Sequence, residues 1–224
     1  MTSIFERQLG SDFERLSPPL RERFGFTAGD GIACIGTGVM DRIWRGPAFT
    51  LPFLYLGSTR NILFPEQGSD VQFIIENYAC LDGLGRETVT FVRTFRLPRR
   101  TRRFDATMIY STGRGRIIDF LGTHQHLAVE LDFSVDDRGG LWIRSAGQRF
   151  VEGPLPWRIP ALLRADATVH EWFDETADRF RIEVTVRSRR FGPIFGYSGS
   201  FRTRYVRTTA IPAGLRPRRE SVRD

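Results

Sequence analysis

Apolar and polar residues alternate with a period of two along most of the chain after residue 70. Val71, Phe73 and Ile75 alternate with Gln72 and Glu76. The same alternation recurs in four later runs, at residues 89–95, 127–133, 180–187 and 195–205. Successive side chains of a β-strand point to opposite faces, so this pattern predicts strands with one buried face and one wet face.

Turn signals separate these runs, for example Asp82-Gly83 and Gly113 to Gly115. Short connections favour antiparallel neighbours. A long meander of such strands tends to curl and close, because closure removes its unpaired edges. The sequence therefore predicts a mainly β fold: a curved antiparallel sheet or lipocalin-like barrel of about 8–10 strands with N-terminal helices.

The apolar residues before the strands have helical spacing instead. They form one stripe: Phe5, Leu9, Phe13, Leu16, Leu20 and Phe24. Gly10 and Pro18-Pro19 interrupt the stripe, so we expect two or three short helices. Together, residues 2–25 would form a helical lid on the barrel. A weaker helical candidate runs from Pro47 toward Gly57. We expect residues 1–208 to form a single domain and 209–224 a basic, disordered tail.

Composition excludes several classes of protein. A chain of 224 residues can bury a full core without disulfides or a structural metal, and two cysteines are too few for a secreted disulfide framework. No segment has the roughly 18–20 apolar residues of a membrane span, and the N-terminus lacks the apolar core of a signal peptide. We expect a soluble, cytoplasmic protein of unknown oligomeric state.

The net charge of +7 is concentrated in two segments. All 33 basic residues are arginine, for which a GC-rich genome is a sufficient explanation. Residues 99–103 contribute +4 and residues 214–224 contribute +2. Without a nucleic-acid motif or a basic face, this distribution argues against specific nucleic-acid binding. It leaves weak contact with an anionic surface or an acidic partner.

Five short segments in a fixed order carry a family resemblance. They are Leu9-Gly10-Ser11-Asp12-Phe13, Phe91-Val92-Arg93-Thr94-Phe95, Gly139-Gly140-Leu141-Trp142, Gly153-Pro154-Leu155-Pro156 and Phe191-Gly192-Pro193-Ile194-Phe195-Gly196-Tyr197-Ser198-Gly199. From Ile4 to Val206 the chain resembles a bacterial domain-of-unknown-function family, number 4166. Its members resemble stand-alone proteins or the part that follows a saccharopine-dehydrogenase-like, nucleotide-binding domain. The family pattern has a tryptophan where this chain has Phe91. The resemblance implies a fold and a compartment but no activity, and any partner oxidoreductase would be a separate protein.

Arg93 is the most informative candidate residue. It shares a strand face with Val89, Phe91 and Phe95, and a buried guanidinium needs partners for its five donors. One interpretation is that Arg93 binds a carboxylate, phosphate or enolate at the base of an apolar cavity. The other is an internal ion pair with Asp105, Asp119 or Glu76.

Tyr197 lies between glycines in Gly196-Tyr197-Ser198-Gly199, where glycine permits a bulge or a close approach of backbone or ligand. Its hydroxyl is placed to donate into a cavity beside Arg93, or to sit at the rim of a packed core. Tyr110 has the same two interpretations.

The chain's metal and cofactor signals are weak. His124 and His126 share a strand face with Glu130, which is chemically reasonable for iron, but that face should be wet. A surface pair of His126 and Glu130 is the preferred interpretation. Cys34 and Cys80 occupy apolar runs typical of inert thiols. Gly36-Thr37-Gly38 is too short for a nucleotide loop. We expect no metal and no cofactor.

The aromatic content raises the prospect of a ligand cavity. Nineteen phenylalanines, four tryptophans and five tyrosines either line a pocket or fill the core. As ligand-binding residues we select Phe91, Phe95, Tyr110 and Trp157. The loop Pro154–Leu163 or the N-terminal helices would close the mouth.

Two functions follow. The first is a small-molecule pocket that binds an apolar ligand with an anionic or carbonyl group. In its catalytic form, this pocket would be the active site of a cofactor-free isomerase or cyclase. Arg93 and Tyr197 would stabilise an oxyanion there, and Glu76 or Asp119 would move the proton. The alternative is a non-enzymatic interaction module that docks a partner oxidoreductase through its arginines.

Overall fold

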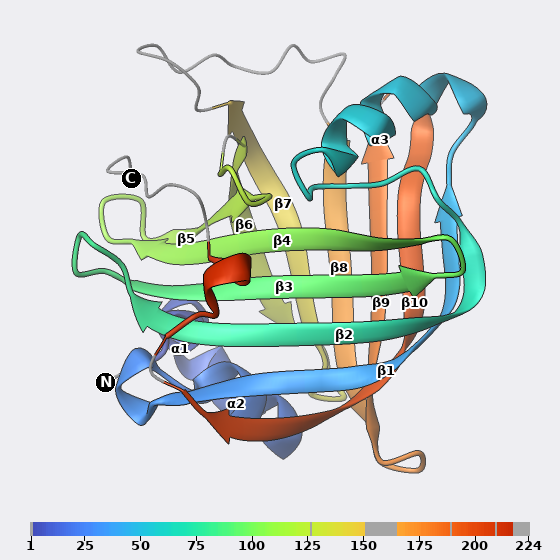
Figure 1. The fold of residues 1–224 in the computed structure, drawn as a ribbon. Coiled ribbons are helices and arrows are strands. Elements are labelled where there is room, and N and C mark those ends of the chain that lie inside the picture. Colours follow the sequence, from blue (N-terminus) through green and yellow to red (C-terminus); the bar gives the residue numbers. More distant parts are fainter. Residues whose placement is uncertain (1, 126, 151–164, 189, 209, 217–224) are drawn as a thin grey trace.

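Ten antiparallel strands close into a single barrel in the computed structural model, which describes residues 2–125, 127–150, 165–188, 190–208 and 210–216 (Figure 1). The strands are β1 (Ile32–Arg45), β2 (Gly68–Leu81), β3 (Glu87–Leu97), β4 (Arg100–Ser111), β5 (Arg116–Leu121), β6 (Leu127–Val135), β7 (Leu141–Phe150), β8 (Ala165–Asp174), β9 (Arg179–Ser188) and β10 (Gly192–Arg207). Each strand pairs with its neighbour in sequence, and β10 pairs with β1 to complete the wall. The predicted mainly β, barrel-like meander is confirmed.

Glycines allow the first and last strands to meet closely at the seam. A Cβ at Gly38 would collide with the backbone of Ser200, and one at Gly199 would collide with the backbone of Val39. The register between β1 and β10 shifts between Val39 and Arg42, beside the same glycines. The expected close approach is therefore made by the β1 backbone at Gly199, and by the Trp44 side chain and the Val184 carbonyl of β9 at Gly196.

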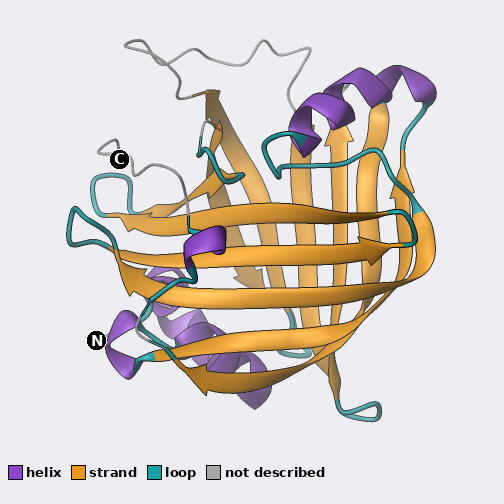
Figure 2. Cartoon of the chain, in the orientation of Figure 1, coloured by secondary structure: helices purple, strands orange, loops and turns teal. Residues whose placement is uncertain are grey.

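Four short helical segments close one end of the barrel (Figure 2). They are α1 (Ile4–Leu9), η1 (Gly10–Arg15), α2 (Pro18–Gly25) and η2 (Ala28–Asp30). Ser3 caps α1 by accepting a hydrogen bond from the backbone N–H of Glu6 at 3.1 Å. The predicted stripe is buried, with only Leu9 partly exposed, and each of its large side chains stabilises the fold by roughly 1.5–3 kcal/mol.

A second helical segment lies at the opposite end of the barrel (Figure 1). It comprises η3 (Ala48–Thr50) and α3 (Leu51–Ser58), close to the helix predicted from Pro47 toward Gly57. Leu54 is buried beneath α3, while its neighbours Phe53 and Tyr55 are exposed. The alternation of turns in an antiparallel meander explains this placement, because the β1–β2 connection must leave the barrel at the end opposite the N-terminal helices.

The chain after β10 folds back along the outside of the barrel. Ile211 is buried against Ala33, Ile35 and Tyr78, and Arg103 donates a hydrogen bond to the carbonyl of Gly214 at 3.1 Å in η5 (Ala213–Leu215). Residues 210–216 thus differ from the expected disordered tail, because Ile211 and Leu215 have an apolar surface to cover. Residues 217–224 lie outside the described residues.

Candidate ligand cavity

An apolar cavity of about 250 Å³ occupies the barrel beneath α3. Its wall consists mainly of inward-facing aliphatic side chains from the strands, including Val129, Leu131, Ile143, Val169 and Val184. Phe53 and Leu54 of α3 line it from above, and no residue of the N-terminal helices lines it. The N-terminal segment is therefore a plug at the far end rather than the expected lid. The Pro154–Leu163 loop lies outside the described residues.

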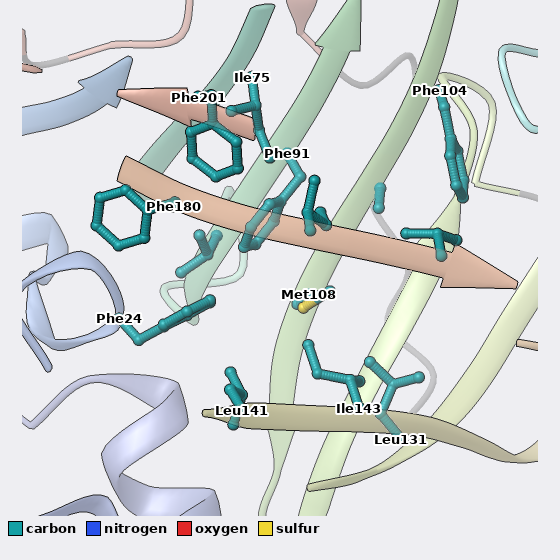
Figure 3. Close-up of a cluster of buried hydrophobic side chains, with 14 of the residues drawn as sticks. Phe24, Ile75, Phe91, Phe104, Met108, Leu131, Leu141, Ile143, Phe180 and Phe201 are labelled. Carbon is teal, nitrogen blue, oxygen red and sulfur yellow. The ribbon is translucent and has the colours of Figure 1, made fainter. Parts of the chain in front are cut away.

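The packed part of the core separates the N-terminal plug from the cavity (Figure 3). Phe24 of α2 lies near Phe180 and Phe201, whose rings stack at 5.4 Å. Farther along the barrel, Met108, Leu131 and Ile143 belong both to the core and to the cavity wall. The barrel interior is consequently solid at one end and hollow at the other.

Arg93 extends from β3 into this apolar space and is only 7% exposed. Its guanidinium carbon lies 4.8 Å from the centre of the Phe104 ring and 5.4 Å from that of Phe91, both favourable cation–π distances. Its Nε and Nη1 atoms are buried with no hydrogen-bond partner among the described residues. Donors of this kind are costly to bury unless another molecule accepts from them.

Asp119 reaches the same cavity from β5 and is also buried. Burial raises the pKa of this carboxyl to about 7, although the attraction of the Arg93 guanidinium acts to lower it. Its Oδ1 atom has no hydrogen-bond partner among the described residues. Of the three carboxylates considered as partners for Arg93, Asp119 is the one that shares its cavity, and the two groups interact at a distance without forming an ion pair.

Tyr197 completes the polar set from β10. Its ring is fully buried against Phe95 at 5.1 Å and Phe195 at 6.2 Å, and its hydroxyl has no hydrogen-bond partner within the described chain. Burial raises the pKa of Tyr197 to about 12, with Arg93 opposing the change. The hydroxyl therefore stays protonated at neutral pH and is available as a donor.

Glu76 is separated from these groups. It lies on the outer face of β2, where Oε1 accepts a hydrogen bond from the Tyr78 hydroxyl at 2.8 Å. Asp105 also lies outside, held by Arg103 at 2.6 Å and by Thr123. The reason is parity, because Glu76 and Asp105 alternate with the inward-facing residues of their strands.

The predicted aromatic ligand-binding residues have different positions. Phe91 and Phe95 are buried in the core beside Arg93 and Tyr197 without lining the cavity. Tyr110 lies near the N-terminal plug, where its ring accepts the Arg7 guanidinium at 4.3 Å. Trp157 falls outside the described residues. The aromatic residues that line the cavity are instead Phe49, Phe53, Phe104, Phe191 and Tyr197.

The histidine pattern does not form a strand. Residues 122–125 are a turn after β5, and Gln125 has a positive φ of 56°, so the expected period-two alternation fails at His124. His126 lies outside the described residues. Glu130 contacts Arg114 and Arg116 on the barrel surface.

A second buried arginine, Arg23 of α2, was not predicted from the sequence. Its Nε donates to Glu171 Oε1 at 2.5 Å, and its Nη1 donates to Asn77 Oδ1 at 2.8 Å and to Cys34 Sγ at 3.2 Å. Burial acts to lower the pKa of Arg23, but Glu171 and Cys34 outweigh this and raise it. On β8, Glu171 faces inward at a position where its alternating neighbours are apolar. A charged residue in that pattern was the sequence feature that could have indicated a buried ion pair.

Comparisons with known proteins identify the family of this chain. The profile of the family described as "Domain of unknown function (DUF4166)" matches residues 16–201, so this closed antiparallel barrel belongs to that family. The chain is similar to "Uncharacterized protein YndH" of Bacillus subtilis (strain 168), with 33% identity over 201 residues that cover 90% of this chain and 97% of the relative. No solved structure gives a significant match.

Within the described part of the chain, none of the helices has the length and apolar character needed to span a bilayer.

Proposed function

We propose that the barrel binds a small, mostly apolar molecule whose carboxylate or carbonyl oxygen accepts hydrogen bonds from Arg93. The observation that carries the proposal is the convergence of three buried groups with unpartnered polar atoms, Arg93, Asp119 and Tyr197, on one apolar cavity. Ligand sites commonly combine an apolar wall with a few oriented polar groups. Cys34 and Cys80 are free thiols, which suits the cytoplasmic location that we assign to the protein.

The cavity sets the size of the ligand. A cavity of roughly 150 Å³ holds one benzene molecule, so about 250 Å³ corresponds by proportion to roughly ten non-hydrogen atoms. Octanoate has this size and carries one carboxylate, and octanol provides the same apolar chain without the charge. The two compounds separate the contribution of Arg93 from that of the apolar wall.

The proposal extends to proton transfer without a cofactor. A carboxyl with a pKa of about 7 exchanges a proton readily at neutral pH. In its ionised form Asp119 would remove a proton from the carbon beside a carbonyl, while Arg93 and Tyr197 donate hydrogen bonds to the developing enolate oxygen. Asp119 would then return the same proton to a different carbon of the conjugated system. The net change is movement of a double bond, an isomerisation that consumes no other reactant.

A β,γ-unsaturated ketone such as cyclohex-3-enone tests this chemistry, because its conjugated product absorbs ultraviolet light. We expect protein-dependent conversion that is lost in Asp119→Asn and retained in Glu76→Gln. The rate should rise with pH up to about 7 and then level, since the ionised carboxylate is the base. Equal rates in wild type and Asp119→Asn would exclude Asp119 as the base while leaving the binding function intact.

The alternative function is a docking module for a separate oxidoreductase. In that case the barrel would have a fully packed interior and would bind its partner through exposed arginines. A cavity with unpartnered polar groups favours the ligand-binding function instead. Salt discriminates between the two. Binding of an apolar acid in a buried cavity should survive high ionic strength, whereas docking through exposed arginines should weaken steeply.

A further inference from the structure

Apolar side chains gather on the outer surface at the mouth of the cavity. Phe49, Phe53 and Leu56 are 50%, 55% and 66% exposed, and Tyr55 is also exposed. Phe49 continues the surface to Phe191 of the β9–β10 turn, with the two ring centres 4.9 Å apart. Single exposed apolar residues are ordinary, but a contiguous set on one helix and the adjoining turn is typical of an interaction surface.

Exposed arginines border this apolar surface. In an antiparallel barrel alternate turns return to the same end, so the β3–β4 and β9–β10 turns lie at the same end as α3 (Figure 1). The first carries Arg99 and Arg100, and the second carries Arg190, all exposed. Acidic residues also lie at this end of the barrel. Glu66 is paired with Arg102, and Asp70 is exposed at the start of β2. The mouth therefore combines an uncharged apolar helix with a positive border.

We propose that this end of the barrel docks on the surface of an anionic lipid bilayer. Phe53 and Leu56 of α3 would enter the region between headgroups and acyl chains, while Arg99, Arg100 and Arg190 contact lipid phosphates. The apolar helix has no charged residue and continues directly into the cavity wall through Phe53. A bilayer matches both features at once, whereas an acidic protein surface would match only the arginines.

This docking adds a route for the ligand and in that respect rests on the proposed function. An apolar acid partitions into bilayers, where its carboxylate lies at the headgroup level. With the mouth of the barrel on the bilayer, the ligand would enter past Phe49, Phe53 and Phe191, which are exposed and also line the cavity, without crossing water. The substrate class is then an amphipathic molecule held in the membrane.

Vesicle flotation tests the proposal with the full-length protein. Vesicles of phosphatidylcholine alone are compared with vesicles of phosphatidylcholine and phosphatidylglycerol in equal parts. We expect binding to the anionic vesicles, with a loss of at least about tenfold in Phe53→Ser/Leu56→Ser and in Arg99→Glu/Arg100→Glu. The matched controls lie at the far end of the barrel: Leu81→Ser/Leu84→Ser for the exposed apolar pair and Arg138→Glu/Arg207→Glu for the exposed arginine pair. These controls should bind as the wild type does.

Three outcomes would overturn the docking surface. They are absence of wild-type binding, equal binding by mouth and control variants, and self-association that Phe53→Ser/Leu56→Ser abolishes while vesicles are ignored. Arg93→Met separates this proposal from the function of the cavity, because it should float with anionic vesicles like the wild type. Intact flotation of a wild-type protein that fails to bind octanoate would refute the cavity function and leave the docking surface standing.

Discussion

Among the residues that the structure describes, two arginines are buried, one near each end of the barrel, and their surroundings differ. Arg23 has protein partners for three of its five N–H groups, in Glu171, Asn77 and Cys34. Arg93 lies in a cavity with Nε and Nη1 unpartnered among the described residues. Both guanidinium groups lie over phenylalanine rings. Arg23 also has one buried nitrogen, Nη2, with no hydrogen-bond partner among the described residues, but its charge is paired with Glu171. The difference is therefore between a guanidinium that is ion-paired and bonded within the fold and one that has no acceptor among the described residues and faces a cavity.

The largest effect on stability is expected at the ion-paired arginine, Arg23. Arg23→Ala leaves Glu171 buried without its cation, and breaking a buried ion pair in this way costs about 3–5 kcal/mol. Urea denaturation measures the loss. Arg21→Ala is the matched control on the same helix, because Arg21 forms an exposed pair with Glu14 and should contribute no more than about 1 kcal/mol. Equal losses in the two variants would remove the distinction between the two ends of the barrel.

Asp119 should make the free energy of unfolding depend on pH. Its pKa is 3.8 by reference and about 7 in the folded protein, so the folded state binds the proton more tightly. The resulting stabilisation is complete below pH ~4 and is lost as the pH rises to ~7, by at most about 4 kcal/mol. Asp119→Asn should remove this slope. Denaturation curves for both proteins between these pH values measure the difference, and parallel curves would contradict the raised pKa.

The contrast between the arginines was only partly accessible from the sequence. Strand alternation correctly placed Arg93 inside, and the same alternation places Glu76 on the wet face, where it lies. Whether Asp119 approaches Arg93 depends on the pairing of β3, β4 and β5 around a closed barrel, which is a long-range property. The ion pair of Arg23 with Glu171 joins residues 148 positions apart, and local patterns carry no information about such a contact.

A smaller effect on stability is expected at Arg93. Arg93→Met removes a buried charge that has no hydrogen-bonded partner and replaces it with apolar volume, so the free energy of unfolding should stay the same or rise by about 1 kcal/mol. Arg96→Gln, on the exposed face of the same strand, controls for the general loss of positive charge. Destabilisation of Arg93→Met by several kcal/mol would mean that Arg93 has a structural role like that of Arg23.

The smallest effect is expected at Glu76. Glu76→Gln keeps an acceptor for the Tyr78 hydroxyl on the outer face, so stability should change by less than about 0.5 kcal/mol. Octanoate binding should also stay the same, because Glu76 does not line the cavity. Calorimetric titration of the variant checks this, and weakened binding would show that the outer face of β2 communicates with the interior.

We propose that the hollow end of the barrel holds an anionic ligand on Arg93. The most direct test of this proposal is the thermal denaturation midpoint of the wild type and Arg93→Met, each with octanoate and with octanol, in high salt. We expect octanoate to raise the midpoint of the wild type, and this rise to fall to the octanol level in Arg93→Met. No rise with octanoate, or an equal rise in both proteins, would contradict the assignment of Arg93 as the ligand anchor.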